Sequence, residues 1–156
     1  MSILGIKMKG QKNKILRTIG VYLLLALVAI GVNFIYGLFG HGVHSAAMTW
    51  MFLYPLLGGA LFYFLLERLK SGITRFAPFR FGYNSYNSGI ATLTVGSFLK
   101  GILEIAGTNS PYLLFFTIMG WLFITVGVTV FALLSVSRKK ISATKKEAPD
   151  YRSVIE

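Results

Sequence analysis

Residues 19–39 read IGVYLLLALVAIGVNFIYGLF, an apolar run that Asn33 alone interrupts. An α-helix rises about 1.5 Å per residue, so about 20 apolar residues cross the ~30 Å hydrocarbon core of a bilayer. Windows at 46–66, 88–106 and 112–136 meet the same criterion, and the third of the four windows is the most polar. Backbone in hydrocarbon must satisfy its own hydrogen bonds, so each window is expected to be a helix. The sequence therefore predicts an all-α, polytopic membrane protein with four transmembrane helices.

The composition agrees with this fold class and excludes several kinds of function. Of the 156 residues, 54% are hydrophobic and only 13% are charged, about half the ~25% of a soluble domain. A net charge of +11 on so apolar a chain argues against a disordered tail and against a soluble nucleic-acid-binding protein. The chain has no cysteine, two histidines and five acidic residues, and no phosphate-binding, zinc-protease or serine-hydrolase motif. We therefore expect no cofactor, no nucleic-acid partner and no enzymatic activity.

Basic residues are distributed unevenly between the segments that connect the four windows. Fifteen of the sixteen lie in 1–18, 67–83 and 138–156, whereas the connections at 41–45 and 107–111 contain none. The positive-inside rule places both termini and the middle loop in the cytoplasm. Short connections favour an up-down-up-down antiparallel bundle, and we expect it to lie in the plasma membrane. Residues 1–18 form a basic cytoplasmic N-terminus, and 138–156 are expected to be a flexible basic tail.

The middle loop, 67–83, alternates basic and aromatic residues. Its aromatic rings suit the depth of lipid headgroups, where Arg75 and Arg80 would contact the phosphates of anionic lipids. A plain interfacial anchor and a contact with a cytoplasmic partner are the alternatives. The loop leads into Asn and Ser residues at 84–88, which favour helix N-caps and would begin the third helix at about residue 88.

Small residues and a proline indicate where the predicted helices pack and bend. Small residues let membrane helices approach closely, so four positions of the third window are expected to be packing sites: Gly89, Gly96, Ser97 and Gly101. In the second window Pro55 removes a backbone donor and should kink the helix. Pro55 and the following Gly58 and Gly59 are therefore hinge candidates, with a simple static bend as the alternative.

Two charges lie within the third window. A charge near the bilayer centre costs roughly 2.5–3.5 kcal/mol, so such residues are candidates for function. Lys100 and Glu104 are four residues apart on one helix face and can form an ion pair. Together with Asn33, which topology places at the same height, they can instead form a proton, ion or ligand site.

The two histidines raise the alternative of a metal site. His41 and His44 in the first short connection could join Glu104 as three ligands with an open position. Loop histidines are usually solvated, so we do not expect a metal here.

Three functions remain open at this point. The first is a non-enzymatic accessory or scaffold subunit that packs through the third helix against a second copy or within a larger membrane complex. The second is a small ion or solute transporter or channel that uses the Lys100 and Glu104 polar face. The third is a metal-dependent membrane enzyme acting at the outer face.

The predicted orientation can be tested with terminal affinity tags. In intact cells a tag at either end should resist an external protease, because both termini are expected in the cytoplasm. Permeabilisation should make both tags cleavable. Cleavage of either tag in intact cells would contradict the orientation.

Overall fold

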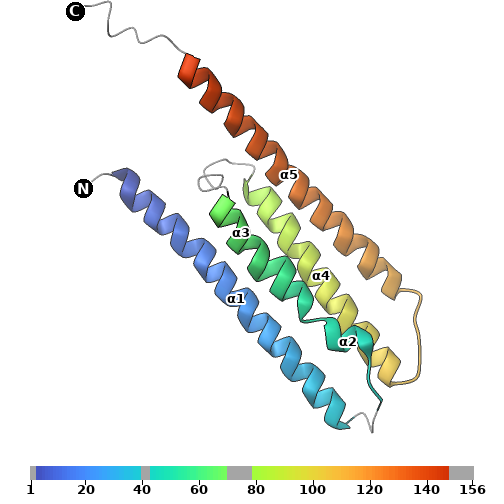
Figure 1. Cartoon of the computed structure of the whole chain (residues 1–156). Coiled ribbons are helices and arrows are strands. Elements are labelled where there is room, and N and C mark those ends of the chain that lie inside the picture. The colour runs from blue at the N-terminus through green and yellow to red at the C-terminus, as the bar shows by residue number, and fades with distance from the viewer. Residues whose placement is uncertain (1–2, 40–42, 70–78, 148–156) are drawn as a thin grey trace, which may run out of the picture.

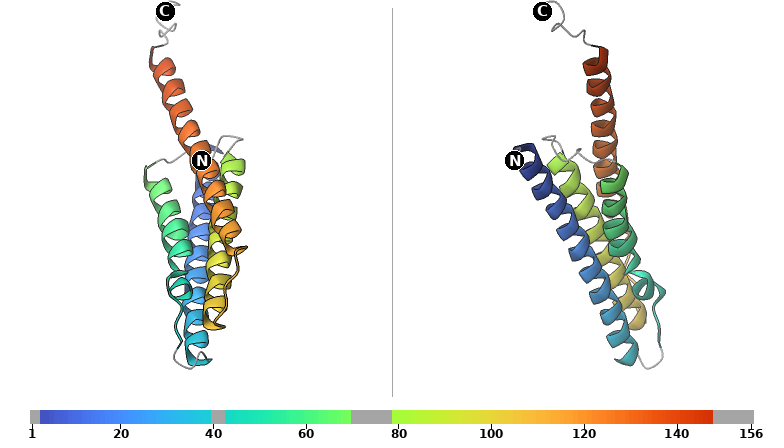
Figure 2. Two further views of the ribbon diagram at one scale, coloured as in Figure 1. Left: turned by 90° about the vertical axis from the view of Figure 1, so that its right-hand side faces the viewer. Right: turned by 60° about the vertical axis from the view of Figure 1, so that its left-hand side comes forward.

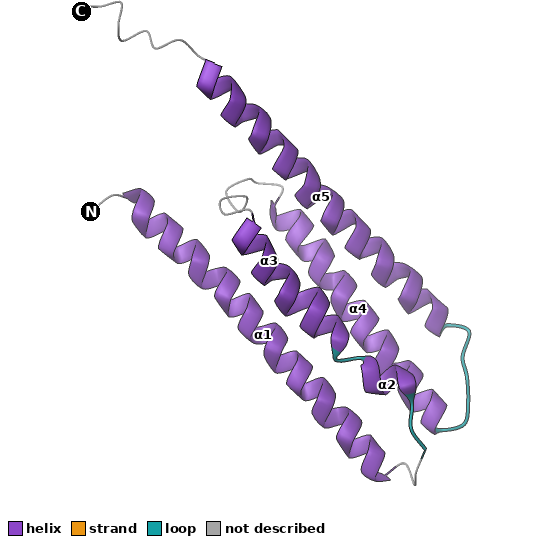
Figure 3. Cartoon of the chain, in the orientation of Figure 1, coloured by secondary structure: helices purple, strands orange, loops and turns teal. Residues whose placement is uncertain are grey.

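The computed structural model describes residues 3–39, 43–69 and 79–147, with side chains over 15–39, 43–68 and 79–137. Its elements are α1 (Ile3–Phe39), α2 (Ala46–Trp50), the π-helix η1 (Tyr54–Leu61), α3 (Phe62–Leu69), α4 (Phe79–Ile105) and α5 (Leu113–Glu147). Figure 3 shows these helices joined by short connections, with no strand in the described part of the chain. The prediction of an all-α protein is confirmed.

Four helical segments are long and apolar enough to cross a membrane. They are Ile15–Phe39, Ala46–Arg68, Phe79–Ile105 and Leu113–Ser137. The prediction of four helices long and apolar enough to span a membrane is confirmed, and the chain is compatible with a small multi-pass integral membrane protein. Figure 1 shows that α1 and α4 begin, and α3 ends, at one end of the molecule. We call this the basic end, because Arg17, Arg68 and Arg80 lie in those segments.

The third span begins at Phe79, nine residues before the predicted residue 88. The prediction that the loop continues to residue 83 and that the Asn and Ser residues at 84–88 cap the helix is therefore wrong. The physical reason is an aromatic stripe. Phe79, Tyr83 and Tyr86 follow helical spacing. The ring centroid of Phe79 lies 5.4 Å from that of Phe131, and the centroid of Tyr83 lies 5.5 Å from that of Tyr63. The ring of Tyr86 stacks on Phe62, with 4.1 Å between the centroids. Such packing outweighs the weak capping preference of Asn and Ser.

The basic C-terminal segment is more helical than predicted. α5 continues to Glu147, so 138–147 are helix rather than a flexible tail, and they project beyond the other helices in Figures 1 and 2. No Gly or Pro interrupts 138–147, so nothing in this segment breaks the helix. α1 likewise begins at Ile3, within the predicted N-terminal segment. The remaining tail residues, 148–156, lie outside the described residues.

The second span is interrupted near its middle instead of forming one regular helix. After α2 the chain turns at Met51 and Phe52, continues as η1 with Pro55 in its first turn, and returns to α-helix at Phe62. Pro55 cannot donate a backbone hydrogen bond and is fully buried. The wider π-turn accommodates the missing bond, and Figure 3 shows the resulting break between α2 and the following helices.

Glycines bring α4 and α5 into close contact. Gly82, Gly89 and Gly96 recur every seven residues on α4, and Gly120 and Gly127 do so on α5. A Cβ atom added at Gly89 would lie 2.8 Å from the carbonyl oxygen of Gly120, and one at Gly127 would lie 2.8 Å from the amide nitrogen of Tyr86. Backbone therefore meets backbone along this pair, as expected where small residues face each other in a membrane.

The remaining helices are arranged so that α1 and α4 are not closely packed against each other. α1 packs mainly on η1 and α3, whereas α4 packs mainly on α5 and touches α2 and η1. The second span thus lies between the two and supports both. A buried cluster joins all the spans near the basic end and consists of Tyr22, Ala60, Tyr63, Tyr86, Ile90 and Phe131.

The glycine contact predicts a difference between two Gly→Ala variants. Gly89→Ala should lower stability by about 1–3 kcal/mol, because backbone and Ile124 must move to admit the methyl group. Gly31→Ala is the matched control, since a Cβ at Gly31 has no neighbour within 4 Å and alanine favours helix. The measurement is the temperature at which each purified variant, heated in detergent, loses its monodisperse peak in gel filtration. Equal temperatures for the two variants would show that the stability of the protein does not depend on the close contact between α4 and α5.

Candidate functional site

A groove separates α1 from α4, and the second span forms its floor. Its volume is about 1240 Å³, larger than the roughly 300–1,000 Å³ of a typical small-molecule pocket. Val21, Leu25 and Val28 of α1 and Ala91 and Val95 of α4 form exposed rims, so the groove opens on the molecular surface. The floor includes Tyr63 and Pro55, which are fully buried.

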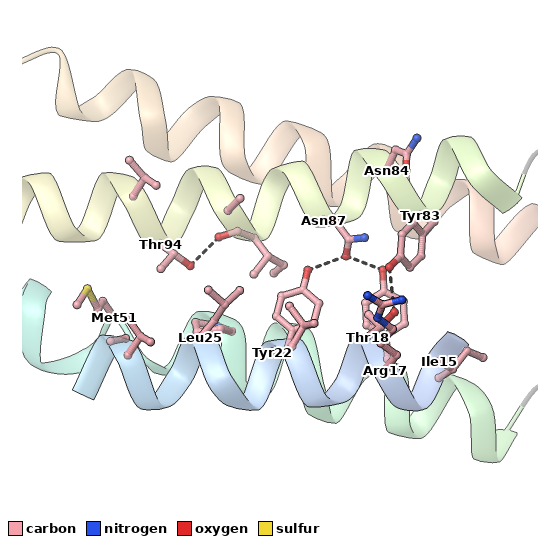
Figure 4. Close-up of a pocket in the computed structure, with 18 of the residues that line it drawn as sticks. Ile15, Arg17, Thr18, Tyr22, Leu25, Met51, Tyr83, Asn84, Asn87 and Thr94 are labelled. Atoms are coloured by element: carbon pink, nitrogen blue, oxygen red, sulfur yellow. Dashed lines mark hydrogen bonds between the residues drawn. The ribbon is translucent and has the colours of Figure 1, made fainter. Parts of the chain in front are cut away.

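A polar centre lies within the groove and joins three spans. The hydroxyl groups of Tyr22 on α1 and Tyr63 on α3 both donate to Oδ1 of Asn87 on α4, at 2.6 and 2.8 Å (Figure 4). The carbonyl oxygen can accept both bonds through its two lone pairs. Asn87 lines the groove, and its amide nitrogen has no hydrogen-bond partner among the described residues, so it keeps two donor hydrogens. Nearby, the hydroxyls of Thr18 and Tyr83 are 3.0 Å apart and link α1 to α4 again.

The groove carries its charge at the basic end. Arg17 and Arg80 line it there, and both are exposed. No lining residue is acidic. Beyond the polar centre the lining becomes apolar apart from Thr94, whose hydroxyl donates to the carbonyl of Ile90. The groove therefore changes from cationic to polar to apolar along its length.

The sequence-predicted polar residues Lys100, Glu104 and Asn33 lie elsewhere, toward the opposite end of the bundle. Lys100 Nζ is 3.8 Å from Glu104 Oε1, and these side chains are 57% and 39% exposed. The buried hydroxyl of Ser45 donates to Glu104 Oε2 and accepts from the backbone of Met48, which caps α2. The hydroxyl of Thr49 lies within hydrogen-bond reach of Asn33 Oδ1 and of the Ser45 carbonyl. These contacts connect α4, α1 and the start of α2, and none of the three predicted residues lines the groove.

The residues considered for a metal are not gathered into a site. His41 lies outside the described residues, and His44 is exposed. Within the described ranges, no group of three His, Cys, Asp or Glu residues is close enough to hold a metal ion. Glu104 instead contacts Ser45 and Lys100.

The four packing candidates of the third span contact other parts of the same chain. Gly89 and Gly96 face Ile124 and Phe116 of α5, and Gly101 faces Met48. Ser97 donates to the carbonyl of Ala47 at 2.7 Å. Since these contacts are internal, this face of α4 is covered and a partner would have to use another surface.

The glycine hinge candidates lie in packed parts of the second span, and one of the two lipid-contact candidates lines the groove. Gly58 lies against Ile90, and a Cβ atom at Gly59 would overlap the ring of Tyr22, so both glycines allow close packing. Arg75 lies outside the described residues, whereas Arg80 lines the groove.

Sequence reasoning missed Tyr22, Tyr63, Asn87 and Arg17 as site residues. The available signal was the helical spacing of Tyr83, Tyr86 and Asn87 directly before an apolar window, which marks a helix that already lies in the bundle. The pairing of Asn87 with tyrosines on two other spans depends on tertiary structure and has no sequence signature.

Comparison with known proteins gives no assignment for this arrangement. No protein family model, curated protein or solved structure matches the chain. Its function must therefore be inferred from the geometry of its own residues.

The polar centre predicts a rescue experiment. Asn87→Leu should lower stability by about 1–3 kcal/mol, because it leaves two buried hydroxyls without an acceptor. Adding Tyr22→Phe and Tyr63→Phe should restore most of the loss, since the unpaired donors are then removed. Thermal unfolding in detergent measures the effect.

The control for this experiment is Asn84→Leu, at an exposed position on the same helix. A loss of stability in the triple variant that exceeds the loss in Asn87→Leu would contradict the hydrogen-bond explanation.

Proposed function

We propose that the protein is a non-enzymatic, multi-pass protein of the plasma membrane that binds a lipid molecule in the groove between α1 and α4. It acts as an accessory component of the membrane, with its four spans arranged up-down-up-down and both termini in the cytoplasm. The basic end then faces the cytoplasm, as the distribution of fifteen basic residues over three segments indicates.

The observation that carries this proposal is the groove itself. Its rims belong to the spans Ile15–Phe39 and Phe79–Ile105, so in a bilayer they meet lipid and not water. From Arg17 to Val32 the lined part of α1 rises about 22 Å, which suits an elongated apolar chain rather than a compact solute. Bilayer lipid is the ligand that such a groove always has within reach.

The other candidate functions have less support from the geometry. Transport through Lys100, Glu104 and Asn33 would need these residues to line a cavity, and they lie outside the groove. A scaffold that pairs with a second copy through Gly89 and Gly96 would need a face that α5 already covers. A metal-dependent enzyme at the outer face has no gathered ligand set within the described residues.

Filling the groove should remove the lipid. In native mass spectrometry from a mild detergent, the wild-type protein should retain one bound lipid. Ala91→Trp places a large ring on the rim of the groove and should reduce the lipid-bound fraction severalfold.

Ala132→Trp is the matched control, because Ala132 is exposed on α5 and does not line the groove. Both variants should elute at the wild-type position in gel filtration. Equal lipid retention by the two tryptophan variants would refute the proposal.

A further inference from the structure

We propose that the lipid in the groove carries an anionic phosphate headgroup, bound at the basic end between Arg17 of α1 and Arg80 of α4. This inference rests on the proposed function and specifies its ligand class. Its evidence is the charge, position and surroundings of the two arginines.

Both arginines lie at the depth where a headgroup would be. Arg17 is the third residue of the span Ile15–Phe39, and Arg80 is the second residue of the span Phe79–Ile105. These spans begin at the same end of the molecule in Figure 1. Each guanidinium thus sits at the membrane boundary on one side of the groove, where cytoplasmic-leaflet phosphates attract basic residues.

Neither guanidinium is neutralised within the described part of the chain. The ion pair among the described residues joins Lys100 and Glu104, far from Arg80 along α4. No acidic residue lines the groove. Two exposed cations at the end of an apolar groove attract an anion, and a guanidinium fork matches phosphate oxygens in a bidentate geometry. Arg68 provides a contrast at the same end of the molecule, because it lies over the ring of Phe64 at 5.5 Å and does not line the groove.

The order of groups along the groove matches the order of groups in a phospholipid. Asn87 lies seven residues after Arg80, about 10 Å further along the helix, and Tyr22 lies about 7 Å beyond Arg17. The free amide hydrogens of Asn87 are therefore placed to donate to ester oxygens that follow a headgroup. Apolar lining residues follow on α1, namely Leu25 (Figure 4), Val28 and Val32, and the acyl chain would lie against them.

A partner's transmembrane helix is a different occupant, and the charge pattern disfavours it. A helix seated along the groove would bring an apolar segment past two unpaired guanidinium groups at the membrane boundary. A phospholipid supplies an anion at that depth and hydrocarbon below it. The recovery of a stoichiometric membrane protein in place of lipid would overturn the inference.

The test is a competition between two lipids with identical acyl chains. Full-length protein in neutral detergent is mixed with equal amounts of phosphatidylglycerol and phosphatidylcholine, and the bound lipids are quantified by native mass spectrometry. The wild type should bind phosphatidylglycerol severalfold better. Arg17→Gln and Arg80→Gln should each reduce this preference about fivefold at low salt, as expected for one arginine near an anionic surface, and the double variant should abolish it.

Matched controls separate this inference from the proposed function. Arg68→Gln should keep the wild-type preference, and millimolar inorganic phosphate should not displace the lipid, because it lacks the chain that fills the groove. If wild type binds both lipids equally while Ala91→Trp still blocks binding, the lipid groove stands and the headgroup assignment fails. If Ala91→Trp does not reduce lipid binding, the proposal that lipid binds in the groove is wrong. An equal loss of preference in Arg68→Gln would reduce the effect to net charge and overturn the role of the two arginines.

Discussion

The carbonyl oxygen of Asn87 receives hydrogen bonds from Tyr22 and Tyr63, and the arrangement of the first three spans depends on this acceptor. A polar group in an apolar bundle is costly unless it is paired, so the three side chains must stay together. Tyr63 lies on the second span, between the helices that carry the other two residues. The contact therefore fixes α1 relative to α4 through a side-chain bridge, without direct packing of the two helices along their length.

The hydrogen-bonded bridge at Asn87 holds α1 and α4 apart, so the groove lies between them. The close packing of α4 on α5 through glycines keeps α4 on the far side of this groove. Because α4 lies against α5 at Gly89 and Gly120, its other side is free to face α1 across the second span. The π-helix contributes on the floor, where Gly59 allows the ring of Tyr22 to lie against its backbone. Pro55 is buried in the floor of the groove. It has no backbone donor, so it fits a segment whose regular hydrogen-bond pattern is already interrupted by the π-helix.

The sequence predicts the number of spans well, because apolar length alone determines which segments can cross a bilayer. It also predicts an irregular second span, since the effect of Pro55 is local. It fails at the start of α4, where Asn84 and Ser85 favour caps but the aromatic stripe through Phe79 and Tyr83 packs as helix. The groove could not be predicted, because it depends on which pairs of helices remain apart, and hydropathy does not record helix pairing. The seven-residue spacing of Gly82, Gly89 and Gly96 is a sequence pattern that indicates close packing of α4 on a neighbouring helix.

The two polar regions of the bundle differ in whether their own chain satisfies them. At the opposite end, Glu104 is satisfied by Ser45 and Lys100, and Ser45 also caps α2, so these contacts account for the predicted polar residues without any ligand. In the groove, the two arginines have no acidic neighbour in the lining and Asn87 keeps two free amide hydrogens. Charge without a counterion at the edge of hydrocarbon is stabilised by whatever anion the membrane offers. The groups that the chain leaves unpaired, rather than the most conspicuous charges in the sequence, are therefore the basis of the proposed lipid site.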